Sequence, residues 1–227
     1  MRRRLPPVLH LVLPRVLPRA LLRDKRGVAM LEFALALPLF LGFVLTAIEF
    51  GNYVMANNRV QRLAAMSADL VAQSGTGEIG IGEGQIYDLF SALDLTARPY
   101  DLRNDGRIVI TGVRGTDIDN NGTTENRMLW QRFDGGYVIA PQVGCNKTVA
   151  IATLPNARAL PLGEILFHVQ VSYKYRPILT DIPFRMLSLP VDFTRIAMFR
   201  ARNKDFQSPT PDDRFPPKDK CTTASGL

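Results

Sequence analysis

The sequence predicts an α+β protein in which a single N-terminal transmembrane helix continues into a long helix packed on an antiparallel β-sheet. Three observations support this fold class. A long apolar run follows a basic leader, an amphipathic helical pattern continues directly from that run, and several strands then follow without long helices between them. At 227 residues the chain can hold one sizeable domain beside such a span.

Residues 1–27 form a basic leader, which we expect to remain in the cytoplasm. The chain has 28 Lys and Arg residues and 21 Asp and Glu residues, and eight of the former but only one of the latter lie in this leader. Positive charge beside a membrane span marks its cytoplasmic side. The rest of the chain is neutral, so we expect no nucleic-acid partner, because a nucleic-acid binder carries its basic surface on the folded domain.

Residues 28–48 are predicted to be the transmembrane helix. At a rise of about 1.5 Å per residue the run is roughly 30 Å long, which is the thickness of a bilayer core. A buried helix of a soluble protein is one alternative, but this run is apolar all round. A cleaved secretory signal is another, but no small-residue cleavage site follows the run at the usual distance.

Residues 49–73 are predicted to continue the helix outside the cytoplasm, with apolar residues at mostly helical spacing among polar ones. A glycine-rich connector at 74–84 ends this helix. An α+β head follows at 85–202 on the same side of the membrane, and a proline-rich tail occupies 203–227.

The head begins with a short helix at 85–93 and is otherwise β-rich. Its clearest strand is 164–175, where large apolar side chains alternate with His168, Gln170 and Ser172. Runs of strands without intervening long helices favour an antiparallel sheet. The other candidate strands are 107–113, 128–133, 137–140, 147–153 and 192–200.

The two cysteines, Cys145 and Cys221, lie on the exported side. Export favours a disulfide between them, which is worth on the order of 4 kcal/mol for a loop of this length and would fix the tail to the head. Two unpaired thiols are the alternative.

Residues 25–33 read Lys-Arg-Gly-Val-Ala-Met-Leu-Glu-Phe and resemble a type IV prepilin processing site. More narrowly, residues 26–39 resemble the TadE/TadG-like family of minor pseudopilins of the tight-adherence (Flp) pilus. Residues 164–200 are similar to the strands near the C-terminus of that family.

The resemblance implies roles for three residues. Prepilin peptidase would cut between Gly27 and Val28, and Glu32 would match the carboxylate that pairs with the N-terminal amine of a neighbouring subunit. Phe33 stands where processed members often have tyrosine, and many members remain uncleaved, so cleavage and retention of the leader both stay open. For Glu32 the alternative is an interfacial carboxylate without a partner.

Residues 117–122 resemble the first half of a calcium loop. Asp117, Asp119 and Asn121 offer oxygen ligands at alternate positions, and Glu125 could reach an ion through water. The acid expected at the twelfth position is replaced by Met128. The alternative is a polar turn between two strands.

From the residues and the resemblance together we expect a membrane-anchored minor pseudopilin-like protein. It would act structurally in assembly of a tight-adherence (Flp, type IVb) pilus or a related secretion apparatus. It would be a single-pass protein of the bacterial inner membrane, with its N-terminus in the cytoplasm and its C-terminal domain in the periplasm. Its partners would be the membrane, other pilin-like or pilus-assembly subunits and prepilin peptidase.

We expect no enzymatic activity and no cofactor other than the candidate calcium ion. The chain has two histidines, and no nucleophile stands beside a suitable base. The alternative function is a periplasmic ligand- or calcium-binding domain tethered by an uncleaved signal anchor.

Overall fold

The computed structural model describes residues 26–74, 80–145, 151–202, 206 and 208–227. The chain divides into two compact units, Met1–Thr46 and Ala47–Leu227. The boundary between these units lies close to the predicted end of the transmembrane segment at residue 48. Most of the leader and part of the glycine-rich connector lie outside the described residues.

The helix α1 (Arg26–Gln73) is continuous over 48 residues, as the sequence predicted for 28–73. It contains Pro38, which bends or loosens a helix in water but is tolerated within a membrane span. Its side chains at 27–45 are exposed, whereas in the second unit it buries Val60, Leu63 and Val71.

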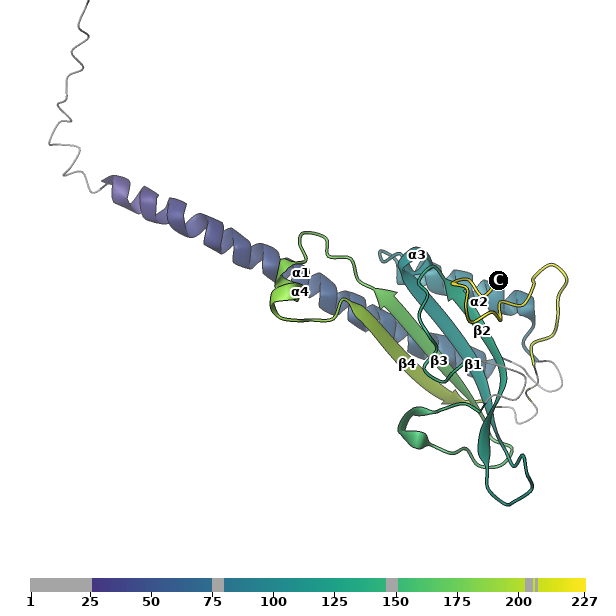
Figure 1. Ribbon diagram of the computed structural model, residues 1–227. Coiled ribbons are helices and arrows are strands. Elements are labelled where there is room, and N and C mark those ends of the chain that lie inside the picture. The colour runs from purple at the N-terminus through teal and green to yellow at the C-terminus, as the bar shows by residue number, and fades with distance from the viewer. Residues whose placement is uncertain (1–25, 75–79, 146–150, 203–205, 207) are drawn as a thin grey trace, which may run out of the picture. The chain divides into compact units, whose positions relative to one another are not determined.

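Four strands form one antiparallel sheet in the order β2-β1-β3-β4 (Figure 1). Their bounds are β1 (Gly106–Thr116), β2 (Glu125–Gly135), β3 (Ile165–Lys174) and β4 (Asp192–Arg200). The predicted α+β class with an antiparallel sheet and one long apolar helix is therefore confirmed.

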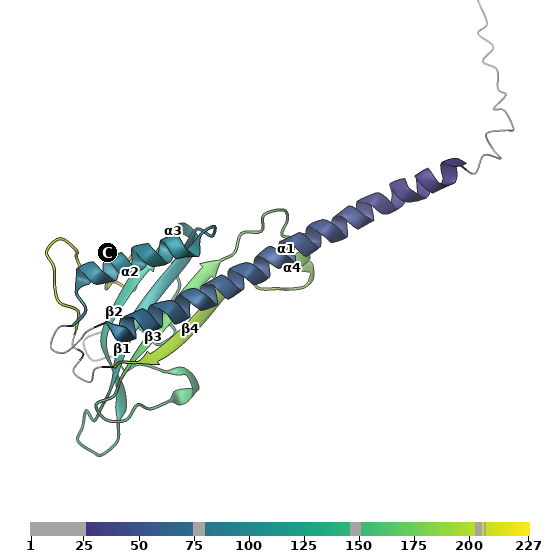
Figure 2. The ribbon, with the colours of Figure 1, turned by 180° about the vertical axis from the view of Figure 1, so that it is seen from behind.

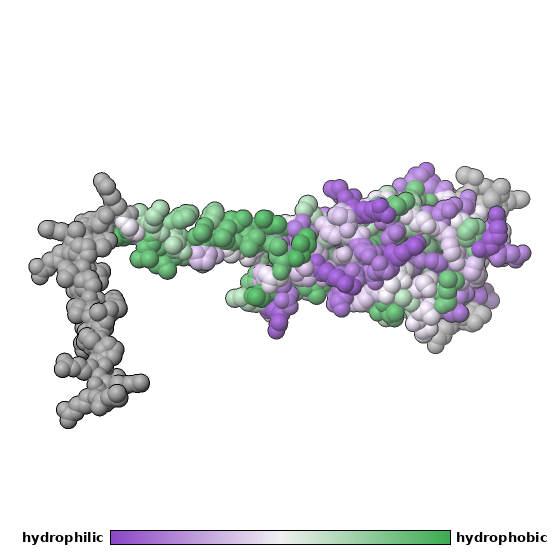
Figure 3. Space-filling view, turned by 90° about the horizontal axis from the view of Figure 1, so that it is seen from above, coloured by the Kyte–Doolittle hydropathy of each residue, from purple (hydrophilic) through white to green (hydrophobic). Residues whose placement is uncertain are grey.

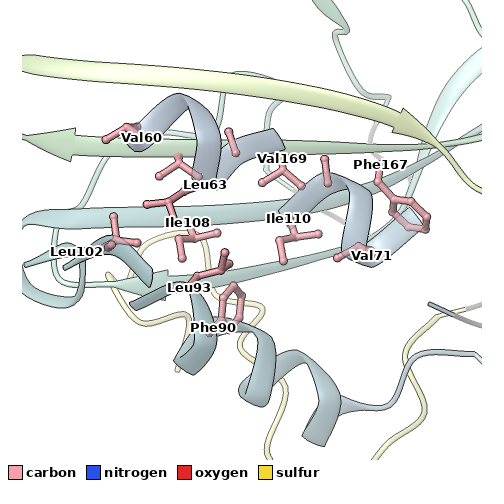
Figure 4. Close-up of a cluster of buried hydrophobic side chains, with 14 of the residues drawn as sticks. Val60, Leu63, Val71, Phe90, Leu93, Leu102, Ile108, Ile110, Phe167 and Val169 are labelled. Atoms are coloured by element: carbon pink, nitrogen blue, oxygen red, sulfur yellow. The ribbon is translucent and has the colours of Figure 1, made fainter. Parts of the chain in front are cut away.

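The second half of α1 and helix α2 (Glu83–Ala97) cover the same face of the sheet (Figures 1 and 2). Ile110 pairs with Val169 across β1 and β3, and both point into a core that also contains Leu63 of α1 and Phe90 of α2 (Figure 4). Full burial of each such side chain contributes about 1.5–3 kcal/mol, so this face accounts for the docking of both helices.

The opposite face of the sheet is also buried, by loops and by the tail. Arg107 of β1 is fully buried there, and its guanidinium donates to the carbonyl oxygens of Ile139, Cys221 and Thr223 at 2.5–2.8 Å. Gln170 of β3 donates to the carbonyl of Ala140 on the same side. The polar side chains on this face therefore hydrogen-bond to the backbone of loops and of the tail, and they do not form a solvated surface.

The described part of the tail is integrated into the head. Thr210 bridges to Gly82 beside α2, the carbonyl of Pro216 accepts a hydrogen bond from Tyr87, and Lys218 pairs with Asp134 of β2. The tail thus passes from α2 across β2 before it reaches Arg107.

The strand predicted at 137–140 is wrong. Gly135 has a φ of 128° and its Cβ position is blocked by the carbonyl of Gly106, so the chain turns away from the ladder after β2. Of the strand predicted at 147–153, residues 147–150 lie outside the described residues, and Ile151 forms an isolated bridge to Arg127.

Three short elements were not predicted: α3 (Leu102–Asp105), the 3-10 turn η1 (Pro155–Ala157) and α4 (Ile182–Met186). Each is shorter than two turns of helix, so none has enough residues to show a helical period in the sequence.

Candidate functional site

The first half of α1 has an exposed apolar surface. Residues 27–45 are all exposed, and Glu32 is their only ionisable residue. Figure 3 shows this apolar surface along the helix and a largely polar surface over the head. By length and composition α1 is able to cross a membrane, and it is the candidate membrane anchor of this chain.

The residues of the predicted processing site lie at the start of this helix. Gly27 and Val28 are in its first turn, and a Cβ added at Gly27 would meet nothing within 4 Å. Packing among the described residues therefore gives no reason for glycine at this position. Glu32 follows about one turn later, is exposed, and has no hydrogen-bond or ion-pair partner within the part of the chain that the structure describes.

A second carboxylate, Glu49, comes directly after the predicted span, and it is only 1% exposed. It accepts a hydrogen bond of 2.6 Å from the Tyr175 hydroxyl and one of 2.8 Å from the backbone N–H of Leu179. The backbone N–H of Ile178 lies 3.1 Å from both carboxylate oxygens. Three donors therefore converge on one carboxylate, which offsets the cost of burying it.

Glu49 fixes the segment 176–190, which we call the junction loop, to α1. The loop contains α4, whose Phe184 is buried and packs against Phe50 and Tyr53 of α1, with ring centroids 5.4 and 5.1 Å apart. The Tyr53 hydroxyl donates to the carbonyl of Pro190 at the far end of the loop. Sequence reasoning assigned no role to Glu49, although a carboxylate immediately after an apolar run was the available signal.

Burial also changes the acidity of Tyr175. Desolvation, followed by the hydrogen bond to Glu49 and the charge of Glu49, raises the pKa of the Tyr175 hydroxyl far above its ordinary value of about 10. Tyr175 therefore remains a hydrogen-bond donor to Glu49 at all physiological pH values.

The predicted calcium loop stabilises itself through its own side chains. The Asp117 carboxylate accepts from the backbone N–H groups of Asn121 and Gly122 at 3.1 and 3.0 Å, and the Asn121 amide donates to Asp119 at 3.1 Å. Within the described residues, no group of three or more His, Cys, Asp or Glu side chains is placed to hold a metal ion. This arrangement accounts for the polar turn, and calcium binding by Asp117, Asp119, Asn121 and Glu125 stays a prediction.

The predicted disulfide between Cys145 and Cys221 is present in the structure, with Cα atoms 5.9 Å apart. It closes a separation of 76 residues and lies beside the Arg107 contacts to the tail. The disulfide and Arg107 therefore hold the same segment of the tail.

His168 has no catalytic environment. It is fully buried in β3, and desolvation lowers the pKa of its imidazole from about 6.5 to about 4. The imidazole is therefore neutral at physiological pH and is shielded from any substrate in solvent.

Among the comparisons with known proteins, one matches the N-terminal helix. The model of a family described as TadE-like protein matches residues 27–69. No curated protein and no solved structure matches the chain. The matched residues all belong to α1, so the comparisons address the helix and leave the head to be interpreted from its structure.

Proposed function

Residues 27–69 of this chain are TadE-like, which confirms the resemblance drawn from the sequence, and from this premise we propose that the protein is a membrane-anchored structural component of Tad (Flp) pilus assembly. The TadE-like family suggests a role in that system. The observation that carries the proposal is the coincidence of the matched segment with the exposed apolar helix.

The charge distribution supports one orientation in the membrane. The basic leader at 1–27 would remain in the cytoplasm of a bacterial cell, α1 would cross the inner membrane, and the head would lie in the periplasm. The disulfide between Cys145 and Cys221 is consistent with an oxidising compartment.

The apolar helix would act by packing against other helices in the membrane. Gly27 and Gly42 each leave open space where a Cβ would stand, which permits close approach of a neighbouring helix. Glu32 would pair there with a cationic group, such as the N-terminal amine of a pilin-like subunit, because a carboxylate in lipid is costly without a partner.

We further propose that this protein is a pseudopilin whose leader is a substrate of prepilin peptidase. The exposed first turn at Gly27 and Val28 is compatible with access of a protease after local opening. N-terminal sequencing from cells with and without the peptidase tests this step. A mature chain that begins at Val28 only when the peptidase is present supports it, and an unchanged N-terminus in both strains contradicts it.

The structural role is tested by deletion of the gene, followed by complementation with variants. Loss of surface pili on deletion, restored by the wild-type chain but not by Glu32→Ala, is the expected result. Asp88→Ala serves as a matched control, because it removes an exposed carboxylate from the head, outside the candidate sites, and should restore piliation. Normal piliation in the deletion strain would contradict the proposal and favour the tethered binding domain.

A further inference from the structure

We propose that the junction loop, residues 176–190, docks on the outer surface of the membrane that α1 crosses and places its apolar side chains at the lipid–water interface. The inference rests on the proposed anchoring of α1 in a membrane. It adds a second membrane contact, made by the head itself, to the contact made by the span.

The junction loop exposes a dense group of large apolar side chains. Met186 is 80% exposed and Ile178 is 68% exposed, although both belong to a folded and hydrogen-bonded segment. Clusters of exposed apolar residues mark surfaces that meet a membrane or another protein. The exposed members are Ile178, Leu179, Ile182, Met186 and Leu187.

The two sides of α4 differ in a way that suits an interface. Phe184 points into the head and packs against Phe50 and Tyr53. Ile182 and Met186 are four residues apart, so they lie on one side of this helical turn, and both are exposed. Within α4, Phe184 therefore packs into the head, while Ile182 and Met186 face outward.

The attachment point places this exposed group at the level where the span ends. The backbone N–H groups of Ile178 and Leu179 bond directly to Glu49, the residue that follows Ile48 at the end of the apolar run. Ile48 itself is 52% exposed. Within the second unit, the junction loop is therefore attached beside the last residue of the predicted span, where lipid headgroups would begin.

The charged side chains of the loop fit a phospholipid surface. Arg176 and Arg185 have side chains 73% and 79% exposed. Arg176 pairs with Asp105, and Arg185 lies 3.8 Å from Asp181, so both arginines are held at the surface of the head. Exposed arginines beside apolar anchors are the combination by which interfacial segments bind anionic lipid. Lipid already surrounds the span, so this occupant requires no additional partner.

The test uses the full chain reconstituted into vesicles of phosphatidylcholine and phosphatidylglycerol. Single cysteines are introduced as Met186→Cys, Leu162→Cys and Phe40→Cys and are labelled with an environment-sensitive fluorophore without reductant, so that the native disulfide stays closed. Leu162 is a matched control because it is 68% exposed and lies before β3, at the opposite end of that strand from the junction loop, and Phe40 reports on the span. Lipids carrying a spin label near the headgroup or deep in the acyl chain serve as quenchers.

We expect the Met186 label to shift its emission to shorter wavelength and to be quenched by the shallow spin label, while the Leu162 label is unaffected. A Met186 label that behaves like the Leu162 label, with the Phe40 label still quenched by the deep spin label, would overturn the docking proposal and leave the anchoring intact. A Phe40 label that is not quenched would instead refute the anchoring itself. The emission shift of the Met186 label could instead disappear as the protein is diluted in lipid. That result would show that the loop contacts a second copy of the chain, and it would also overturn the proposal.

Discussion

At the scale of single residues, Glu49 links the end of the apolar helix to the head. Its carboxylate is 1% exposed and accepts hydrogen bonds from Tyr175, Ile178 and Leu179. A buried carboxylate is tolerated only when its oxygens are satisfied, and its removal leaves the donors without partners. The side chain therefore helps to hold the junction loop on α1, together with the contacts of Phe184 and Tyr53.

Replacement of Glu49 by alanine should release the junction loop. Loss of hydrogen bonds to a buried charged group costs about 3 kcal/mol, which raises the opening equilibrium of the loop roughly 100-fold. Limited trypsin digestion of the full chain in detergent, followed by mass spectrometry, would show faster cleavage after Arg185. Asp69→Ala on the same helix is the control, and equal cleavage rates in both variants would contradict this role of Glu49.

His168 should make the head less stable in mild acid. Its pKa is lowered by burial to about 4, below the value of about 6.5 expected in the unfolded chain, so the unfolded state binds the proton first as pH falls. Stability is complete above about pH 6.5 and decreases toward pH 4, with a loss of about 2 kcal/mol between pH 7 and pH 5. Thermal unfolding at several pH values measures this slope, which should diminish in His168→Gln. The same slope in both proteins would show that other groups are responsible.

At the scale of elements, the tail depends on contacts that lie far apart in the sequence. The disulfide joins Cys221 to Cys145, while Arg107 of β1 binds the carbonyls of Cys221 and Thr223. These contacts close the face of the sheet opposite the two helices. The tail is therefore part of the structure of the head.

Opening the disulfide should destabilise the head without abolishing its fold. The double variant Cys145→Ser and Cys221→Ser removes a cross-link that is worth on the order of 4 kcal/mol in the chain-entropy model. Denaturant unfolding of the variant and of the unreduced wild type measures the difference. Because Arg107 still holds the tail, we expect the spectrum of β-sheet to persist in the native state, and equal stability of the two proteins would contradict the estimate.

Element prediction from the sequence succeeded where one period extended over many residues. The strand predicted at 192–200 has the bounds of β4, and the alternation over 164–175 identified β3. The sequence could not show that His168, Gln170 and Ser172 are buried, because polar residues in alternation normally face water. Their burial depends on loops and on the tail, which reach them only in the folded chain.

The candidate site shows the same contrast between residues that are close together in the sequence and contacts between residues that are far apart in it. Gly27, Val28 and Glu32 were predicted as site residues because they lie close together in one short motif, and the structure places them in the first turns of α1. The role of Glu49 was missed because its partners are more than 120 residues away, in a segment without a helical or strand period. A side chain that binds backbone groups far away in the sequence leaves no pattern in the spacing of residues.

At the scale of the whole molecule, the two units differ in how their apolar side chains are covered. The described residues of the first unit expose an apolar helix, whereas the unit Ala47–Leu227 buries both faces of a sheet. An apolar surface of that length is stable in lipid and unstable in water. The TadE-like match covers residues 27–69 of the same helix.

The most direct test of the central claim is the location of the C-terminal end in living cells. A reporter enzyme that is active only after export would be fused after Leu227, in the full chain and in a variant that lacks residues 28–48. We predict activity with the full chain and none with the variant, because residues 28–48 should carry the head across the membrane. A second reporter that is active only in the cytosol would be fused at the same position. Activity of this second reporter alone would contradict the account.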